Sequence, residues 1–246
     1  MDKEKFINEI NHIGFTVHEN VFDHDMIVDL NEYASTLQPQ RGHDKNMKWY
    51  GWNNVEDMKN PKEEIDWAYY WTPHVNHPHI ENIKHQLSPM ADAAFGKNNW
   101  VWHVQDFIVL HPGMNFYRPH IDTPYRFKEF RYAEGLLGLQ FMVMMCDFTP
   151  DNGATGYVPG SHKYIYDGIH MRDKQESWRL FFADNYEQYT AGAGSFVCWH
   201  PRLIHSTMPN KSNEIRRALL LHAAEKKTAR KLEAIDPQFN YDLRTT

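Results

Sequence analysis

The sequence has 246 residues, of which 41% are hydrophobic and 24% charged, with a formal net charge of -6. These values are ordinary for a chain that buries a core, and they exclude general disorder. The acidic balance excludes a basic surface for a nucleic-acid backbone, and no apolar run in the sequence is long enough to cross a membrane. Cys146 and Cys198 are the two cysteines, which we interpret as free thiols in a reducing compartment, so we expect a cytoplasmic protein.

The N-terminal third of the sequence favours helices. Apolar residues at helical spacing predict three amphipathic helices, over residues 3–13, 23–35 and 79–95. Asp23 is placed to cap the second helix, and Gly14 to end the first. A short strand is expected over residues 15–17.

An aromatic-rich segment, Trp49 to Trp71, separates the second helix from the third. It begins in a polar, irregular stretch, residues 38–60, and continues into a predicted short helix, residues 61–70. So many large aromatic side chains either fill the core beneath the N-terminal helices or form a lid that closes over a ligand. The histidine-rich stretch 72–79 follows, and we interpret its histidines as capping or solvent-facing groups because prolines make the chain irregular there.

The sequence after Gly96 favours strands. β-rich or apolar runs predict strands, over residues 100–111, 138–147, 194–199 and 217–223, with a mixed loop over 163–189. Helices followed by short antiparallel strands predict an α+β fold, mainly β, with a double-stranded β-helix (jelly-roll, cupin-like) core on which the N-terminal helices pack. We expect a single domain, 1–246, with a helical and aromatic-rich N-terminal region over residues 1–95, a β-helix core over 96–225 and a C-terminal extension over 226–246.

The His120-x-Asp122 triplet is a candidate metal-binding element. In an extended backbone, residues two apart share a face, so the imidazole and the carboxylate point the same way. A facial triad for Fe(II) needs one more histidine and leaves three coordination positions open. His205, after an apolar strand, is the candidate for this ligand, and His200 is its rival.

A pair of arginines opens the last predicted strand. Arg216 is the candidate to bind a carboxylate, because a guanidinium can hold both carboxylate oxygens. Arg217 points to the opposite face of a regular strand, so a slip of one residue would exchange the two roles. Gln140 and Met142 share one strand face, which looks into the barrel or packs in the core.

The sequence resembles the phytanoyl-CoA dioxygenase family of Fe(II)/2-oxoglutarate oxygenases. The resemblance covers about residues 100–225 and is carried by ordered motifs: His120-x-Asp122, Asp147-Phe-Thr-Pro-Asp-Asn-Gly153 running into Val158-Pro-Gly-Ser-His162, His205, and Asn210-Lys-Ser212 before Arg216. It implies Fe(II) on His120, Asp122 and His205, with 2-oxoglutarate and O2 as co-substrates. It also implies that Arg216 anchors 2-oxoglutarate with help from Thr207, and we add Gln140 as a further co-substrate candidate.

The expected function is a dioxygenase that hydroxylates a small-molecule substrate, with release of succinate and CO2. Because Asp122 supplies the carboxylate ligand, the related halogenases, which have a small residue there, are disfavoured. We interpret His162, Asn152 and Gly153 as turn-forming residues. The alternative function is a non-catalytic, cupin-like metal- or ligand-binding module.

Overall fold

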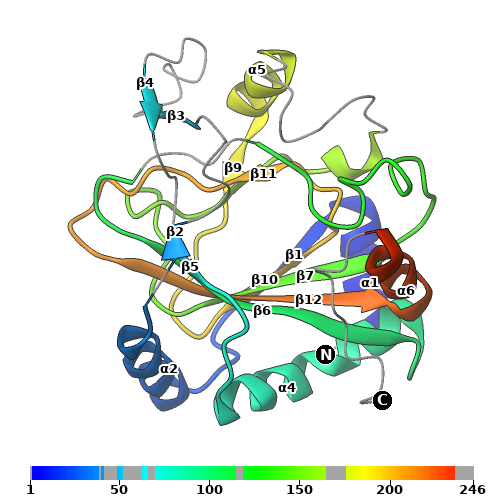
Figure 1. Cartoon of the computed structure of the whole chain (residues 1–246), viewed down its shortest axis with the longest axis horizontal. Coiled ribbons are helices and arrows are strands. Elements are labelled where there is room, and N and C mark those ends of the chain that lie inside the picture. The colour runs from blue at the N-terminus through cyan, green and yellow to red at the C-terminus, as the bar shows by residue number, and fades with distance from the viewer. Residues whose placement is uncertain are drawn as a thin grey trace.

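Helices and a small sheet lie on opposite sides of one large antiparallel sheet (Figure 1). The structure is a computed structural model that describes residues 2–38, 40–41, 49–51, 63–65, 70–114, 119–164 and 176–235. Within these residues no helix is long and apolar enough to span a membrane.

The three predicted N-terminal helices are confirmed to within one or two residues. They are α1 (Lys3–His12), α2 (His24–Thr36) and α4 (Pro78–Phe95). The Asp23 side chain accepts a hydrogen bond from the backbone N–H of Asp25, which makes it the predicted N-cap of α2. Gly14 ends the first helical segment at φ +95°, a conformation that glycine adopts at little cost, and β1 (Phe15–His18) follows.

The predicted long strands meet in one sheet of seven strands in the order β1-β10-β7-β12-β6-β5-β2, and the pairings are antiparallel. The strands that follow β1 are β2 (Gln40–Arg41), β5 (Tyr70–Thr72), β6 (Trp100–Leu110), β7 (Gly138–Met144), β10 (Phe196–Trp199) and β12 (Arg216–Glu225). The last strand in this sequence order, β12, pairs on both sides, with β6 and with β7.

The strand β7 shows how the two faces of this sheet differ. Leu139, Phe141 and Val143 pack in the same apolar cluster as the buried residues of α1, α2 and α4. Met142 and Met144 belong to a different cluster, which faces away from the helices. Because side chains alternate along a strand, Gln140 lies on the same face as Met142, as the sequence predicted.

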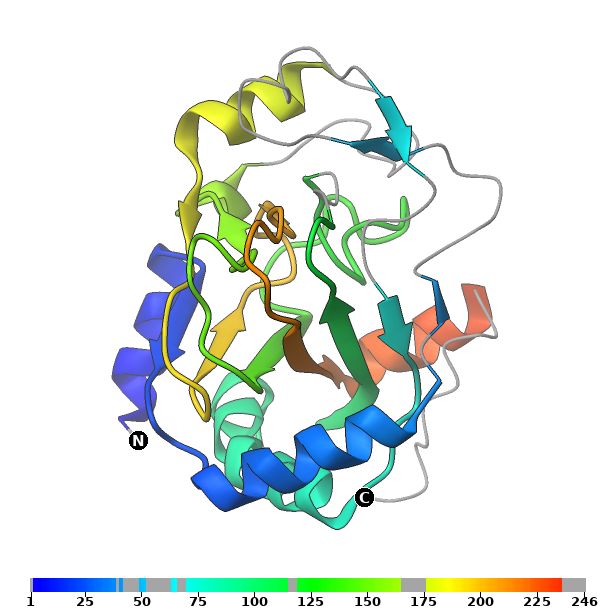
Figure 2. The same ribbon diagram turned by 90° about the vertical axis from the view of Figure 1, so that its left-hand side faces the viewer.

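A three-stranded sheet covers that second face, with the order β11-β8-β9. Its strands are β8 (Gly156–Tyr157), β9 (Glu187–Gln188) and β11 (His205–Ser206), and the short 3-10 helix η1 (Ser161–Lys163) follows β8. An apolar cluster fills the interior between the sheets and includes Met142, Tyr157, Tyr189 and Trp199. Figure 2 shows the layers from the side, with α2 and α4 on one side of the strands and α5 (Glu176–Asn185) on the other.

Two of the predicted elements were wrong. Residues 63–65, in the predicted helix 61–70, form β4 (Glu63–Ile65), because they pair with β3 (Trp49–Gly51). The predicted loop 163–189 contains the helix α5. The C-terminal extension, for which the sequence predicted no element, begins with α6 (Lys226–Ile235), which packs Ala229 and Leu232 against Val101. The side chains of the aromatic segment Trp49 to Trp71, and with them the choice between lid and core, lie outside the described residues.

Candidate metal centre

Three of the predicted ligands, His120, Asp122 and His205, converge on one point. The Nε2 atom of His120 lies 3.6 Å from Asp122 Oδ1, and the Nε2 atom of His205 lies 3.4 Å from Asp122 Oδ2. One ligand atom of each residue lies within 4.8 Å of the other two. Within the described regions of the chain, this is the group of three or more histidine, cysteine or acidic side chains that is close enough to share a metal ion.

Backbone hydrogen bonds hold the three ligands in place. The His120 N–H donates to the carbonyl of His205 at 3.0 Å, and the His205 N–H donates to the carbonyl of His120 at 3.1 Å. The Asp122 N–H donates to the carbonyl of Pro201 at 2.7 Å. The extended triplet therefore pairs directly with the segment that carries the distal histidine, which places side chains far apart in sequence at one site.

The hydrogen bond of His205 sets which ring nitrogen faces the site. Its Nδ1 atom lies 2.9 Å from the carbonyl oxygen of Leu203, which can only accept, so Nδ1 carries the proton. In the neutral imidazole Nε2 is then the unprotonated nitrogen, and it directs its lone pair toward the Asp122 carboxylate. Two acceptor groups aimed at each other repel unless a cation lies between them, so this donor set fits a divalent metal ion.

The rival ligand His200 lies outside this group and has a structural environment. Its Nδ1 atom accepts a hydrogen bond from the Arg202 N–H at 3.0 Å, and its ring stacks on Tyr125. Burial lowers the pKa of His200 to about 3, so the ring stays neutral. His162, which the sequence assigned to a structural turn, hydrogen-bonds through Nε2 to the carbonyl of Asn11 at 3.0 Å.

Arg216 is a buried cation on the interior side of the large sheet. Its side chain is 1% exposed, and its guanidinium carbon lies 4.1 Å from the centre of the Phe148 ring. A terminal nitrogen donates to the Thr155 hydroxyl at 3.0 Å. Burial lowers the pKa of Arg216 to about 10, and no carboxylate among the described residues forms an ion pair with it.

Arg217 faces the other side of the sheet, toward the helices. It is half-buried, and a terminal nitrogen lies 3.5 Å from the Asn31 side-chain oxygen of α2. The strand register therefore places Arg216, and not Arg217, in the interior. A cation buried without an anionic partner is costly, so its retention inside the fold points to an anionic ligand.

The remaining predicted residues, Gln140 and Thr207, lie in different settings. Gln140 is buried on β7 between its strand partners Trp199 and His222, and its side-chain oxygen has no hydrogen-bond partner in the described structure. Thr207 is half-buried, and within the described residues no hydrogen bond joins its side chain to Arg216. The hydroxyl beside the guanidinium belongs to Thr155.

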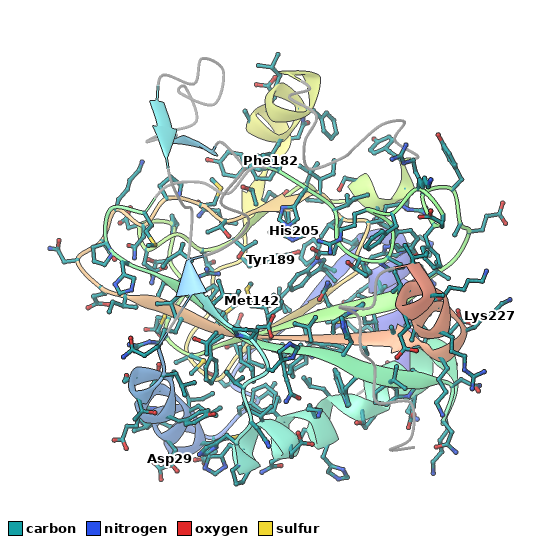
Figure 3. All side chains as sticks on the ribbon, in the orientation of Figure 1. Asp29, Met142, Phe182, Tyr189, His205 and Lys227 are labelled. Atoms are coloured by element: carbon teal, nitrogen blue, oxygen red, sulfur yellow. The ribbon has the colours of Figure 1, made fainter. Side chains whose placement is uncertain are left out.

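Sequence reasoning therefore missed Thr155 and Trp199. Thr155 lies two residues after the Asn152-Gly153 turn, and its closeness to this motif could have marked it as a candidate. Trp199 donates its indole N–H to Asp122 Oδ2 at 3.1 Å, and alternation along β10 could have placed it on the interior face. In Figure 3, Met142 on the large sheet and His205 on the small sheet lie on facing sides of this interior.

The site brings two imidazoles and one carboxylate to one point, with a buried guanidinium in the same interior. Non-haem iron enzymes that use a facial triad have this donor set. The chain belongs to the phytanoyl-CoA dioxygenase family, whose profile matches residues 10–218. Family membership together with the triad confirms the expected cofactor and co-substrates, which are Fe(II), 2-oxoglutarate and O2.

Several solved structures have a fold similar to that of this chain. The epimerase SnoN, in a complex with Fe3+, alpha ketoglutarate and nogalamycin RO, is 14% identical and has a TM-score of 0.65, over 91% of this chain and 83% of SnoN. The carbocyclase SnoK from nogalamycin biosynthesis is 16% identical with a TM-score of 0.65, over 90% and 83% of the two chains. AviO1 from Streptomyces viridochromogenes Tue57 is 18% identical with a TM-score of 0.61, over 92% and 96%. At these identities the likeness concerns the fold.

Proposed function

We propose that this protein is an Fe(II)- and 2-oxoglutarate-dependent oxygenase that hydroxylates a small-molecule substrate and releases succinate and CO2. The observation that carries the proposal is that two features occur together. The first is the metal-ligand group His120, Asp122 and His205, and the second is Arg216, a buried cation with no anionic partner among the described residues. The triad would hold the metal, and Arg216 would hold the co-substrate.

The triad would supply three of six coordination positions. Fe(II) held there would accept 2-oxoglutarate as a chelating ligand and would supply the activation of O2 for oxidation of the substrate. The backbone pairing of His120 with His205 places the two imidazoles next to each other, which would reduce the ordering needed on metal binding. The hydrogen bond from His205 Nδ1 to Leu203 keeps Nε2 available as a ligand.

Arg216 would bind the distal carboxylate of 2-oxoglutarate, and Thr155 would add a hydroxyl donor. A guanidinium nitrogen donates a hydrogen bond to Thr155 Oγ1, so the two groups are close enough to hydrogen-bond to the same carboxylate. A carboxylate placed there would neutralise the buried charge, which the described protein side chains do not do. Gln140, whose buried side-chain oxygen has no partner in the described structure, would add a polar contact to the bound co-substrate.

The interior around these groups is apolar. Met142, Tyr157, Tyr189 and Trp199 pack between the two sheets, and each is at most 6% exposed. Such surroundings keep water from the reacting groups and strengthen the electrostatic interactions among them. We further propose that the two facing sheets form a double-stranded β-helix and that the chain forms one domain, 1–246.

Two alternatives to hydroxylation remain: a protein that binds metal without catalysis, and an enzyme that catalyses a different reaction. A non-catalytic cupin-like module would bind metal without consuming 2-oxoglutarate. The related structures include an epimerase and a carbocyclase, so the same kind of site could instead invert a configuration or close a ring. Product mass distinguishes these reactions, because hydroxylation adds one oxygen atom, ring closure removes two hydrogens, and epimerisation leaves the mass unchanged.

The test is an anaerobic titration of the protein with Fe(II) and 2-oxoglutarate, followed by addition of O2. We expect the weak visible charge-transfer band of the iron chelate to form, and succinate to appear once O2 is admitted. The Asp122→Ala variant should show neither, whereas Asp25→Ala, which changes an exposed aspartate on α2, should match the wild type. Absence of the band in the wild-type protein would refute the proposal, and a band without succinate would favour the non-catalytic module.

A further inference from the structure

Trp199 is the side chain that contacts the carboxylate of the candidate ligand Asp122 most directly from outside the triad. Its indole Nε1 lies 3.1 Å from Asp122 Oδ2. The residue sits on β10, paired in register with Phe15 of β1 and Gln140 of β7, and it is 3% exposed. Neighbours on both sides therefore hold the indole ring in a fixed position.

The two histidines lie farther from the carboxylate than the indole N–H does. His205 Nε2 lies 3.4 Å from Oδ2, against 3.1 Å for the indole nitrogen, and in the neutral ring, with the proton on Nδ1, this Nε2 is an acceptor. His120 Nε2 lies 3.6 Å from the other oxygen, Oδ1, which is beyond hydrogen-bond distance. Within the described residues, Trp199 is thus the side-chain donor to the Asp122 carboxylate.

We propose that Trp199 is a positioning residue that orients the Asp122 carboxylate for binding metal through one oxygen. This inference rests on the proposed function of the site. The N–H group occupies one lone pair of Oδ2 and draws charge from this oxygen, which favours metal binding through Oδ1 alone over binding through both oxygens. With a single oxygen bound, the triad leaves three positions open, enough for the two donor atoms of 2-oxoglutarate and for O2.

The ring of Trp199 adds a second constraint. It stands edge-on to His205, with ring centres 5.3 Å apart and planes at 61°. One side chain therefore contacts two of the three ligands, through its N–H group and through its ring. Replacing Trp199 by Phe removes the N–H while keeping an aromatic ring, which separates the two contributions.

The chain offers a matched control in Trp100. Its indole N–H donates to the Asp92 carboxylate at 2.8 Å, a hydrogen bond between α4 and β6 on the helix side of the sheet. Trp100→Phe therefore also removes an indole-to-carboxylate hydrogen bond, but away from the candidate metal ligands. Any effect that both variants share reports on general stability and not on the metal site.

The first experiment is a Co(II) titration of the wild type, Trp199→Phe and Trp100→Phe, followed by visible absorption. Loss of a hydrogen bond to a ligand typically weakens metal binding by about 10- to 100-fold, which we expect for Trp199→Phe and not for Trp100→Phe. We also expect the Co(II) spectrum of Trp199→Phe to change in shape and intensity, because a freed carboxylate can bind through both oxygens. Equal affinities and identical spectra in the three proteins would overturn the proposal.

The second experiment does not require Trp199→Phe to fold, and it uses metal-free protein. Indole N–H signals of 15N-tryptophan-labelled wild type and Asp122→Ala would be compared by NMR, with Trp100→Phe identifying the signal of Trp100. We expect one indole signal other than that of Trp100 to shift strongly in Asp122→Ala. If no indole signal depends on Asp122, the Trp199 hydrogen bond is absent and the proposal fails. Failure of the wild type to bind Co(II) would instead count against the proposed function.

Discussion

Replacing Arg216 by Met should separate co-substrate binding from stability. The guanidinium is fully buried and has no anionic partner among the described residues, and burial lowers its pKa from 12.5 to about 10. That lowering corresponds to about 3 kcal/mol by which the interior disfavours the charged form. Removing the charge relieves this cost, while the lost hydrogen bond to Thr155 and the lost contact with the Phe148 ring offset it by about 1–3 kcal/mol.

We therefore expect the free energy of unfolding of metal-free Arg216→Met to lie within about 2 kcal/mol of the wild type. Binding of 2-oxoglutarate should suffer far more, because a buried carboxylate loses its charged partner. A loss of about 2–5 kcal/mol corresponds to about 30-fold to several thousand-fold weaker binding. Calorimetric titration of the Co(II)-loaded protein with 2-oxoglutarate measures the affinity, and urea denaturation of the metal-free protein measures the stability.

Arg217→Met is the matched control, since it makes the same change one residue along on the opposite face of β12. It should leave 2-oxoglutarate binding unchanged, because Arg217 contacts Asn31 of α2. The reasoning would be refuted if Arg216→Met kept normal affinity while losing more than about 3 kcal/mol of stability, as removal of a structural charge does. It would also be refuted if Arg217→Met were the more damaging to binding.

Other predictions concern the candidate metal ligand Asp122, the buried acid Asp106 and the glycine Gly14. Asp122→Ala should lower iron content and succinate formation while leaving the circular dichroism spectrum unchanged, and full activity would exclude the triad. Burial raises the pKa of Asp106 to about 6, so its ionisation lowers the free energy of unfolding as pH rises from about 4 to about 6. Urea denaturation should therefore show Asp106→Asn to be more stable than the metal-free wild type by up to about 3 kcal/mol at pH 7, and equally stable at pH 4. Gly14→Ala should cost about 2–4 kcal/mol of unfolding free energy, because its Cβ would clash with His162 Nδ1 at a φ of +95°. Gly113→Ala, at φ +79° with nothing within 4 Å, should cost only about 1 kcal/mol, and equal losses would contradict the role of the clash.

The long elements were predictable because their periodicity is local. The helix Pro78–Phe95 and the strand Trp100–Leu110 carry enough residues for their apolar spacing to be recognised. The strands of two residues were not, because a pair such as His205–Ser206 has no period and is defined only by its partner. Pairing with β3 likewise overrode the helical tendency of Glu63–Ile65.

The candidate site was predictable where the sequence carries a motif, and unpredictable where contacts join distant segments. His120, Asp122 and His205 follow a recognisable pattern, although spacing alone left His200 open. The contact of Arg216 with Thr155 spans 61 positions, and that of Trp199 with Asp122 spans 77. Such pairs depend on which strands lie side by side, and strand order is a property of the whole sheet.

The central place of β12 in the large sheet has a consequence for how the chain folds. This strand comes after β6 and β7 in sequence but lies between them and pairs with both. Until β12 has been synthesised and inserted, β6 and β7 would each have an unpaired edge. Their apolar residues on the helix side would also lack the neighbours that β12 supplies, Leu219, Leu221 and Ala223. Open edges of this kind are templates for aggregation, and pairings across so long a stretch of chain form slowly. During synthesis, the nascent chain would therefore depend on protection of these two edges until its last strand closes the sheet.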